Sequence, residues 1–449
     1  MKLIISLCCI LIVAFNVSAQ QLWTLEQCIR HAHENNIQLK QQYLEVYQAE
    51  NDFLQSKLSL LPSVSASSNF NSSRGKVLDQ NTFTVVEGRT VNSMSGGISS
   101  SVTLFKGLQQ QNTIDRNMYS LLASYQNVEK LKNDLSINIT LYYLQIIHAQ
   151  EQLIVAENQL KLTLLQIERT RILVNTGSVP EGNLFELQSQ ASYEELQIVI
   201  ARSRLEFARL NLAQLLDLEA PTHFHIVTPN FTNIAVSEPV VSVGHAYTAA
   251  ASFLPQVKAA EYYLKSAEKQ LSIAKGYRSP TLSLSSGYNT RYSSSAKMYD
   301  PVTLEQLSYS LGNQLRDGVN SYIGLGLSIP IFNGWQVQAN VKNANFNLQN
   351  QHYQFQLVIN NLYKEIQQAH ADVEEAFKRY VASTKAVVSM EEAFRYAEQR
   401  YEVGLINFVD YTTIKTRLAA AQSDLIQAKF EYIFKTKVFD FYRGWPIRL

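Results

Sequence analysis

The sequence predicts a mainly α-helical fold with membrane β-structure, in which long coiled-coil helices form an α-helical barrel that joins a β-barrel. Three observations predict this class. Nearly the whole chain consists of an internal sequence repeat: Gly107 and Gly334 lie 227 residues apart, and so do Gly177 and Gly404. Short segments alternate between polar and apolar residues, which is typical of strands with one buried face. Longer segments repeat apolar residues every seven positions, which is typical of coiled coils.

The N-terminus predicts export. Residues 1–19 combine a basic start, a short apolar run and a small-residue site that ends at Ala19. This is the pattern of a secretory signal peptide, so we expect cleavage after Ala19. Two of the three cysteines lie in this leader and only Cys28 remains. We therefore expect no intramolecular disulfide and no cysteine-bound metal.

Composition narrows the class of partner. The 39 basic and 38 acidic residues nearly cancel, which predicts no nucleic-acid partner. Charged residues make up only 17% of the chain, and no apolar stretch after the leader is long enough for a transmembrane helix. An exported chain with these properties fits a periplasmic or outer-membrane protein.

The repeat predicts two copies of one unit, over residues 22–216 and 241–443. Residues 217–240 contain three prolines and are predicted to be a linking segment, and 444–449 form a C-terminal tail. Copy one is predicted to contain helix 22–60, strands 61–74 and 90–105, long helix 108–174, tip turn 175–183 and helix 184–216. Copy two is predicted to contain helix 241–276, strands 279–292 and 319–332, long helix 335–402, tip turn 403–409 and helix 410–443.

The first helix and first strand of each copy are matched by sequence. The segment IQLK at 37–40 corresponds to PQVK at 255–258, and Pro62 corresponds to Pro280. Each proline precedes a strand. From Val64 to Phe70, every second residue is apolar or small, and the residues between are Ser and Asn.

Two ordinary hairpins packed on a soluble core would show the same alternation. The polar faces, however, are nearly all Ser, Asn and Gly, and the strands reach roughly 10 residues, as membrane-barrel strands do. We therefore expect the apolar faces to contact outer-membrane lipid.

The long helices carry the seven-residue repeat. In copy one it runs through Leu121, Val128, Leu135, Tyr142, Ala149 and Ala156. Copy two repeats it at the equivalent positions, 227 residues later. At 1.5 Å per residue the first of these helices would be roughly 100 Å long. We expect an elongated tube.

Four amphipathic strands cannot span a bilayer alone, because their open edges would leave backbone groups unpaired in hydrocarbon. The smallest membrane barrels have about eight strands, and three copies of this chain would supply twelve. In each copy the second strand runs straight into the long helix. We therefore expect Gly107 and Gly334 to mark the switch from barrel to helix, where lipid gives way to water.

The duplicated helix–strand–strand–helix unit, the LFKG and IFNG switches and the YEVGLINFVDYTTI turn resemble the TolC family of outer-membrane efflux and secretion channels. The resemblance covers nearly the whole mature chain. It implies a homotrimer with a 12-stranded barrel and a helical barrel in the periplasm. It also implies two partners, a periplasmic adaptor (membrane fusion) protein and an inner-membrane RND or ABC transporter.

The resemblance also indicates the residues of the tip. Gly177 and Gly404 would lie at turns or helix C-caps that need a positive φ. Of the two acidic positions in the family pattern, the first is Asp410 and the second is Thr413, and the tyrosine of the pattern is Tyr401. The basic residue is missing, since Ile406 takes its place.

In the first tip turn, Gly182-Asn183 replaces the Thr-Asp pair of the pattern. The familiar polar latch is therefore not expected. Around a threefold axis Asp410 would form an acidic ring at the pore aperture; as an alternative, it is a solvated carboxylate at the start of a helix.

No catalytic, cofactor or metal site is predicted. His31 and His33 stand two residues apart on a helix and do not face each other. His223 and His225 lie in an irregular segment with no third ligand nearby. The sequence has no G-x-S-x-G, phosphate-loop or H-E-x-x-H motif.

The predicted function is the exit duct of a tripartite efflux system for small toxic compounds. Two alternatives remain open. The same duct could serve type I protein secretion with an ABC exporter, or the chain could be a soluble periplasmic coiled-coil scaffold.

Overall fold

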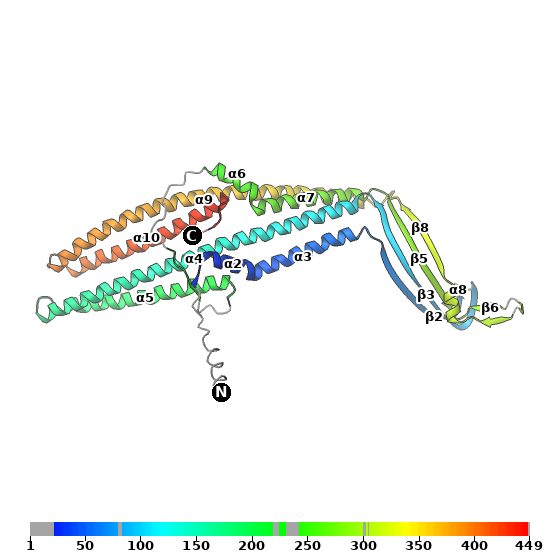
Figure 1. The fold of residues 1–449 in the computed structure, drawn as a ribbon, viewed down its shortest axis with the longest axis horizontal. Coiled ribbons are helices and arrows are strands. Elements are labelled where there is room, and N and C mark those ends of the chain that lie inside the picture. The colour runs from blue at the N-terminus through cyan, green and yellow to red at the C-terminus, as the bar shows by residue number, and fades with distance from the viewer. Residues whose placement is uncertain are drawn as a thin grey trace, which may run out of the picture. The chain divides into compact units, whose positions relative to one another are not determined.

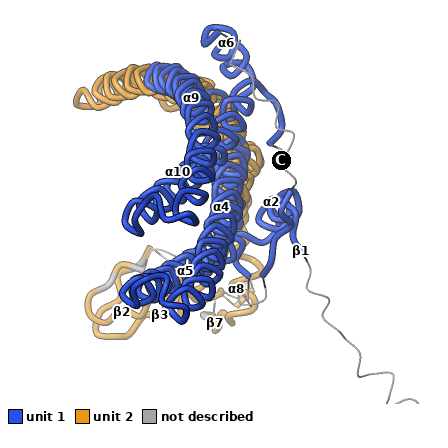
Figure 2. Tube along the Cα trace, turned by 90° about the vertical axis from the view of Figure 1, so that its left-hand side faces the viewer, with its two compact units in different colours: residues 1–44, 126–258, 356–449 blue, residues 45–125, 259–355 orange. Residues whose placement is uncertain are grey.

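The computed structural model describes residues 22–79, 83–218, 224–229, 242–299, 302–303 and 305–447 (Figure 1). The predicted leader and most of the predicted linking segment, including His223, lie outside the described residues. The chain divides into two compact units (Figure 2). Unit 1 contains residues 1–44, 126–258 and 356–449, and unit 2 contains residues 45–125 and 259–355.

Unit 2 is built on a four-stranded antiparallel sheet of order β2-β3-β5-β8. Its strands are β2 (Ser63–Asp79), β3 (Thr84–Lys106), β5 (Thr281–Ser293) and β8 (Asn320–Ser328). The register places Phe70 opposite Met94 and Leu284 opposite Leu325 on one face. The opposite face is lined by Ser, Asn and Gly, and its hydroxyl groups pair across the strands, as between Ser65 and Ser99 at 3.0 Å.

The apolar face of this sheet has no cover in the described chain. The exposed fractions are 68% for Phe70, 82% for Ile323 and 69% for Leu325. Cross-strand pairs of this kind normally stabilise a sheet by excluding water. The sheet therefore presents an apolar surface on one side, and on the other side a surface of small side chains that is rich in hydroxyl groups.

The strand predicted over 319–332 ends earlier in the structure, at Ser328. The pairing of β8 with β5 stops where Ser328 meets Thr281, and Pro330 has no N–H group to continue a ladder. The strand predicted over 61–74 extends to Asp79 because β2 and β3 keep pairing beyond an irregularity at Gly75.

The segment between β5 and β8 contains elements that were not predicted. These are β6 (Lys297–Tyr299), β7 (Gln306–Ser308) and helix α8 (Leu311–Asp317). The Gln314 amide takes the place of a neighbouring strand at the end of β5: Ser293 N donates to Gln314 Oε1 at 2.9 Å, and Gln314 Nε2 donates to Ser293 O at 3.1 Å. A side-chain contact of this kind leaves no periodicity in the sequence.

Two helices predicted as single are each broken in the structure. Residues 22–60 contain α2 (Leu25–Asn35) and α3 (Ile37–Leu58), and residues 241–276 contain α6 (Val243–Phe253) and α7 (Pro255–Gly276). Leu254 is extended because the following proline disfavours a helical residue before it. At the other break, Asn36 Oδ1 accepts the backbone N–H of Leu39 at 3.2 Å and so caps α3.

The long helices α4 (Gln109–Asn175) and α9 (Gln336–Glu402) each contain 67 residues, or about 100 Å at the α-helical rise. The returning helices are α5 (Glu181–Leu215) and α10 (Phe408–Tyr442). None of the helices in the described ranges has an 18-residue stretch apolar enough to cross a bilayer. The predicted class, mainly α with one amphipathic sheet, is confirmed.

Unit 1 holds an extensive apolar core. The two-residue strands β1 (Leu22–Trp23) and β4 (His225–Ile226) pair in parallel beside it. Helices α2, α4, α5 and α10 contribute fully or nearly fully buried residues, among them Cys28, Ile139, Ile146, Leu212 and Phe430. Burial raises the pKa of the Cys28 thiol to about 12, so this cysteine is a core residue.

Candidate functional site: the tip turns and a buried ion pair between helices

The two tip turns have the same backbone geometry. Gly177 has φ +73° and Gly404 has φ +76°. In the first turn, the N–H of Gly177 donates to Val174 O and the N–H of Ser178 donates to Leu173 O, at 2.9 and 2.8 Å. The second turn repeats both bonds, from Gly404 to Tyr401 and from Leu405 to Arg400. Each turn is therefore a Schellman C-cap, which requires the left-handed conformation that glycine adopts most easily.

Asp410 and Thr413 lie on the first two turns of α10, and both are exposed. The backbone N–H of Asp410 donates to Asn407 Oδ1 at 2.8 Å, so Asn407 caps the helix. Thr413 Oγ1 donates to Val409 O at 2.7 Å. The Asp410 carboxylate is thus presented to solvent beside the tip, and its place in an acidic ring stays a prediction.

Asn183 and Tyr401 lie in different environments. Asn183 is in the first turn of α5, where its backbone N–H donates to Pro180 O at 3.2 Å. Tyr401 is half-buried, and its ring stacks on that of Tyr411 with centroids 4.7 Å apart. Burial raises the pKa of Tyr401, while a hydrogen bond from Gln166 on α4 opposes the rise.

Within unit 1 the helical hairpin α4–α5 is joined to the hairpin α9–α10 close to the tips. Arg169 on α4 forms an ion pair with Glu402 on α9, and the two side chains are 49% and 38% exposed. An ion pair with this exposure contributes little to stability.

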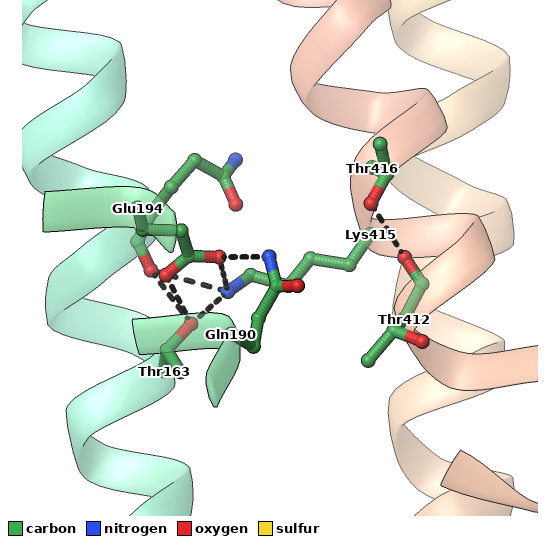
Figure 3. Close-up of polar contacts among 7 residues, drawn as sticks. Thr163, Gln190, Glu194, Thr412, Lys415 and Thr416 are labelled. Atoms are coloured by element: carbon green, nitrogen blue, oxygen red, sulfur yellow. Dashed lines mark hydrogen bonds and ion pairs between the residues drawn. The ribbon is translucent and has the colours of Figure 1, made fainter. Parts of the chain in front are cut away.

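A second junction between the hairpins is buried (Figure 3). Lys415 Nζ donates to Glu194 Oε1 at 2.9 Å, to the Gln159 carbonyl oxygen at 3.1 Å and to Thr163 Oγ1. Glu194 also accepts hydrogen bonds from Thr163 Oγ1 and from Gln190 Nε2. The three donors of the ammonium group therefore have acceptors on both α4 and α5.

Burial distinguishes this junction from the other ion pairs. The exposed fractions are 5% for Lys415, 6% for Glu194 and 2% for Thr163. Removing one partner of such a pair leaves an uncompensated buried charge, which typically costs about 3–5 kcal/mol. The junction therefore holds α10 against α4 and α5 in one defined arrangement.

The heptad pattern contains a signal for this junction. Thr163 occupies the next position of the seven-residue series that runs through Tyr142, Ala149 and Ala156 on α4, so a polar side chain replaces an apolar one in the seam. Glu194 interrupts a seven-residue series on α5 in the same way, since it lies seven positions from the buried Leu187 and from the buried Ala201.

A hollow of about 590 Å³ lies beside the ion pair. Its walls combine polar residues, among them Gln152, Arg204, Asp424 and His148, with alanine and other apolar residues. Burial, and to a smaller extent the charge of Arg204, lowers the pKa of His148. The walls carry no nucleophile paired with a base, and the described residues contain no group of three or more potential metal ligands of the His, Cys, Asp and Glu types.

The two switch segments in unit 2 also repeat each other. Gly107 and Gly334 have φ +58° and +61°, and the residues that follow, Leu108 and Trp335, have φ +57° and +68°. The copies differ in packing. A Cβ atom on Gly107 would lie 2.5 Å from Ser279 Cβ, whereas a Cβ atom on Gly334 would meet nothing within 4 Å.

Comparison with known proteins extends these findings. The model of a family described as outer membrane efflux protein matches residues 28–217 and 247–433. The outer membrane efflux protein BepC of Brucella suis is 20% identical over 91% of this chain and 83% of its own length. The outer membrane protein TolC of Escherichia coli is 22% identical over 76% of this chain and 69% of its own length.

The fold has a solved counterpart. The crystal structure of the Campylobacter jejuni outer membrane channel CmeC superposes with a TM-score of 0.78 and 18% sequence identity. The match covers 94% of this chain and 85% of that one.

Proposed function

Because the chain belongs to the outer membrane efflux protein family, we propose that it is the exit duct of a tripartite efflux system for small toxic compounds. Family members and structural neighbours are outer-membrane channels and not enzymes. The proposed partners are two further copies of the chain, a periplasmic adaptor protein and an inner-membrane RND or ABC transporter. In this proposal the leader 1–19 directs export, the sheet enters the outer membrane and the helical hairpins remain in the periplasm.

One observation carries the proposal: the sheet has an exposed apolar face, an opposite face of Ser, Asn and Gly, and open edges. In the four-stranded order of the described chain, β2 and β8 each have a neighbour on one side only. Such edges are not tolerated in hydrocarbon, so they must be paired by other copies. Three copies supply twelve strands, more than the minimum of about eight.

The helices support a duct that continues beyond the sheet. α4 starts three positions after the end of β3, and α9 starts eight positions after the end of β8; each connection contains a left-handed pair, at Gly107-Leu108 and Gly334-Trp335. The tip turns at Gly177 and Gly404 end the hairpins and expose apolar side chains, with Val403 and Leu405 each 69% exposed. An adaptor that covers these side chains would remove their apolar surface from water.

Deletion and cross-linking together test the proposal. Loss of the gene should increase intracellular accumulation of an efflux dye, and the wild-type gene should restore its export. A Ser178→Cys variant should cross-link to lysines of the adaptor through a short reagent that joins a thiol to an amine. Gln349→Cys, on the exposed surface of α9, should not. Unchanged dye accumulation together with the loss of one secreted protein would instead favour type I secretion.

A further inference from the structure

Where the strands adjoin the helices, the strand ends and helix ends carry basic charges only. The sequence contains no Asp or Glu in residues 53–78, 88–114, 269–299 or 318–364. The basic residues closest to the junction between sheet and helices are Lys57, Lys106, Lys275 and Arg278. Since the whole chain is nearly neutral, this region of unit 2 is strongly asymmetric in charge.

Two of these cations, Lys106 and Arg278, have no carboxylate partner in the part of the chain that the structure describes. Lys106 Nζ lies 5.8 Å from the centroid of the Tyr277 ring. Arg278 Nη2 donates to Gln338 Oε1, a neutral amide, which leaves the other guanidinium N–H groups available. A guanidinium presents paired donors that fit phosphate oxygens.

A hollow of about 250 Å³ lies beside Arg278. It is lined by Tyr277, Arg278, Ile331, Phe332 and Trp335, together with nearby residues of the same loop. Ile331, Phe332 and Trp335 are 94%, 85% and 65% exposed. Apolar surface of this size is unfavourable in water by roughly 25 cal/mol for each Å².

We propose that this hollow binds a membrane phospholipid, with the phosphodiester on Arg278 and Lys106 and the upper acyl chain against Ile331, Phe332 and Trp335. This inference rests on the proposed function, which sets the sheet in the outer membrane. Aromatic side chains favour the headgroup level of a bilayer, and basic pockets at that level bind anionic lipid headgroups. The lipid belongs to the leaflet that faces the helical part of the chain.

Charge complementarity favours a lipid over a second copy of the chain as the occupant. A neighbouring copy that pairs with β8 would present its own free edge strand, β2. Residues 53–78, which include most of β2 and the end of α3, contain Lys57, Arg74 and Lys76 but no carboxylate. Of these, Lys57 lies at the end of α3, next to the end of β2 that adjoins the helix. A second copy would therefore add positive charge beside Arg278, whereas a phosphodiester neutralises it.

The equivalent position in copy one is closed. Gly107 lies against Ser279 and the Gly276 carbonyl, so close that an added Cβ would be 2.5 and 2.6 Å from them. The open position at Gly334 occurs once in each chain. Each trimer should therefore hold three such lipids.

Native mass spectrometry of the trimer, purified in mild detergent and supplied with phosphatidylglycerol, tests the site. The wild type should retain up to three lipids per trimer. The double variant Lys106→Gln, Arg278→Gln should bind them about tenfold more weakly or worse, since each cation near a headgroup contributes on the order of a kilocalorie per mole. Lys364→Gln removes an exposed cation from α9, away from the hollow, and should bind as the wild type does.

Two further measurements make the result unambiguous. Trp335→Ala should also weaken lipid binding, and inorganic phosphate should compete with the lipid only weakly because it lacks the acyl chains. Equal lipid binding by the wild type and the double variant would overturn the proposal, as would equal binding of free phosphate. Conductance of the same preparations in planar bilayers tests the duct separately from the lipid site. If the protein conducts but binds no lipid at this hollow, the lipid site is contradicted and the proposed duct is not.

Discussion

At the scale of single residues, the central feature is the pairing of Lys415 with Glu194. The sequence shows polar residues in the apolar seams of three helices, but the two charged partners lie 221 positions apart. Periodicity identifies which face of a helix a residue occupies and not which helix packs on that face. The turn glycines could be located by comparing the copies, because Gly177 and Gly404 lie 227 residues apart. Asp410 was indicated by the family resemblance, since copy one has Asn183 at the matching position.

Replacing Lys415 with Met should destabilise the protein by about 3–5 kcal/mol, because Glu194 then remains buried without its cation. The free energy of unfolding, measured by denaturant titration of the purified protein, checks this. Lys378→Met is the matched control: its ion pair with Glu374 is largely exposed, so the loss should stay under about 1 kcal/mol. Equal losses in the two variants would show that the buried junction has no special role.

Asp410→Asn should lower the preference of the channel for cations, because the proposed threefold ring would lose its negative charge. The measurement is the reversal potential of single channels under a salt gradient. Thr413→Ala, on the same exposed turn, is the uncharged control and should leave selectivity unchanged. If Asp410→Asn leaves both conductance and selectivity as they were, the carboxylate is only a solvated group at the helix start.

At the scale of elements, the two copies have nearly the same order of helices and strands, but copy two contains the additional elements β6, β7 and α8. The seven-residue repeat located both 67-residue helices to within two residues at each end. The repeat could not reveal the two helix breaks. The break at Asn36 depends on a side-chain cap, which leaves the apolar pattern unchanged. The break at Leu254 depends on Pro255, and proline is also common in the first turn of a continuing helix. Nor could the repeat reveal α8, whose attachment depends on the single amide of Gln314.

The two switch glycines should respond differently to the same substitution. Gly107→Ala should disturb folding strongly, because its Cβ would clash with Ser279 and the Gly276 carbonyl. Gly334→Ala has the same unfavourable φ but open space, so only the conformational penalty of about 1–2 kcal/mol applies. The yield of heat-stable trimer measures both, and equal yields would contradict the close packing at Gly107.

The tip turn at Gly404 should tolerate Asn better than Val. Both replacements must adopt φ +76°, but Asn enters the left-handed region far more readily than a β-branched residue. Efflux and adaptor cross-linking should therefore fall in Gly404→Val and be largely kept in Gly404→Asn. Full activity of the Val variant would mean that the Schellman geometry is not needed at the tip.

At the scale of the whole molecule, the family resemblance and the fold class are confirmed by the family match over both copies. The duplication carried most of that prediction, because it fixed the order of elements before any was assigned individually. The sequence could also indicate that the sheet needs partners, since the alternation predicts an apolar face and four strands are too few to close a membrane barrel. The proposed compounds, pump and adaptor leave no mark in the periodicity of the sequence.

Planar-bilayer recording of the purified protein tests the central claim most directly. The account predicts a detergent-stable trimer that inserts into the bilayer and gives discrete, uniform conductance steps. A monomer that stays in the aqueous fraction and leaves the bilayer silent would contradict it.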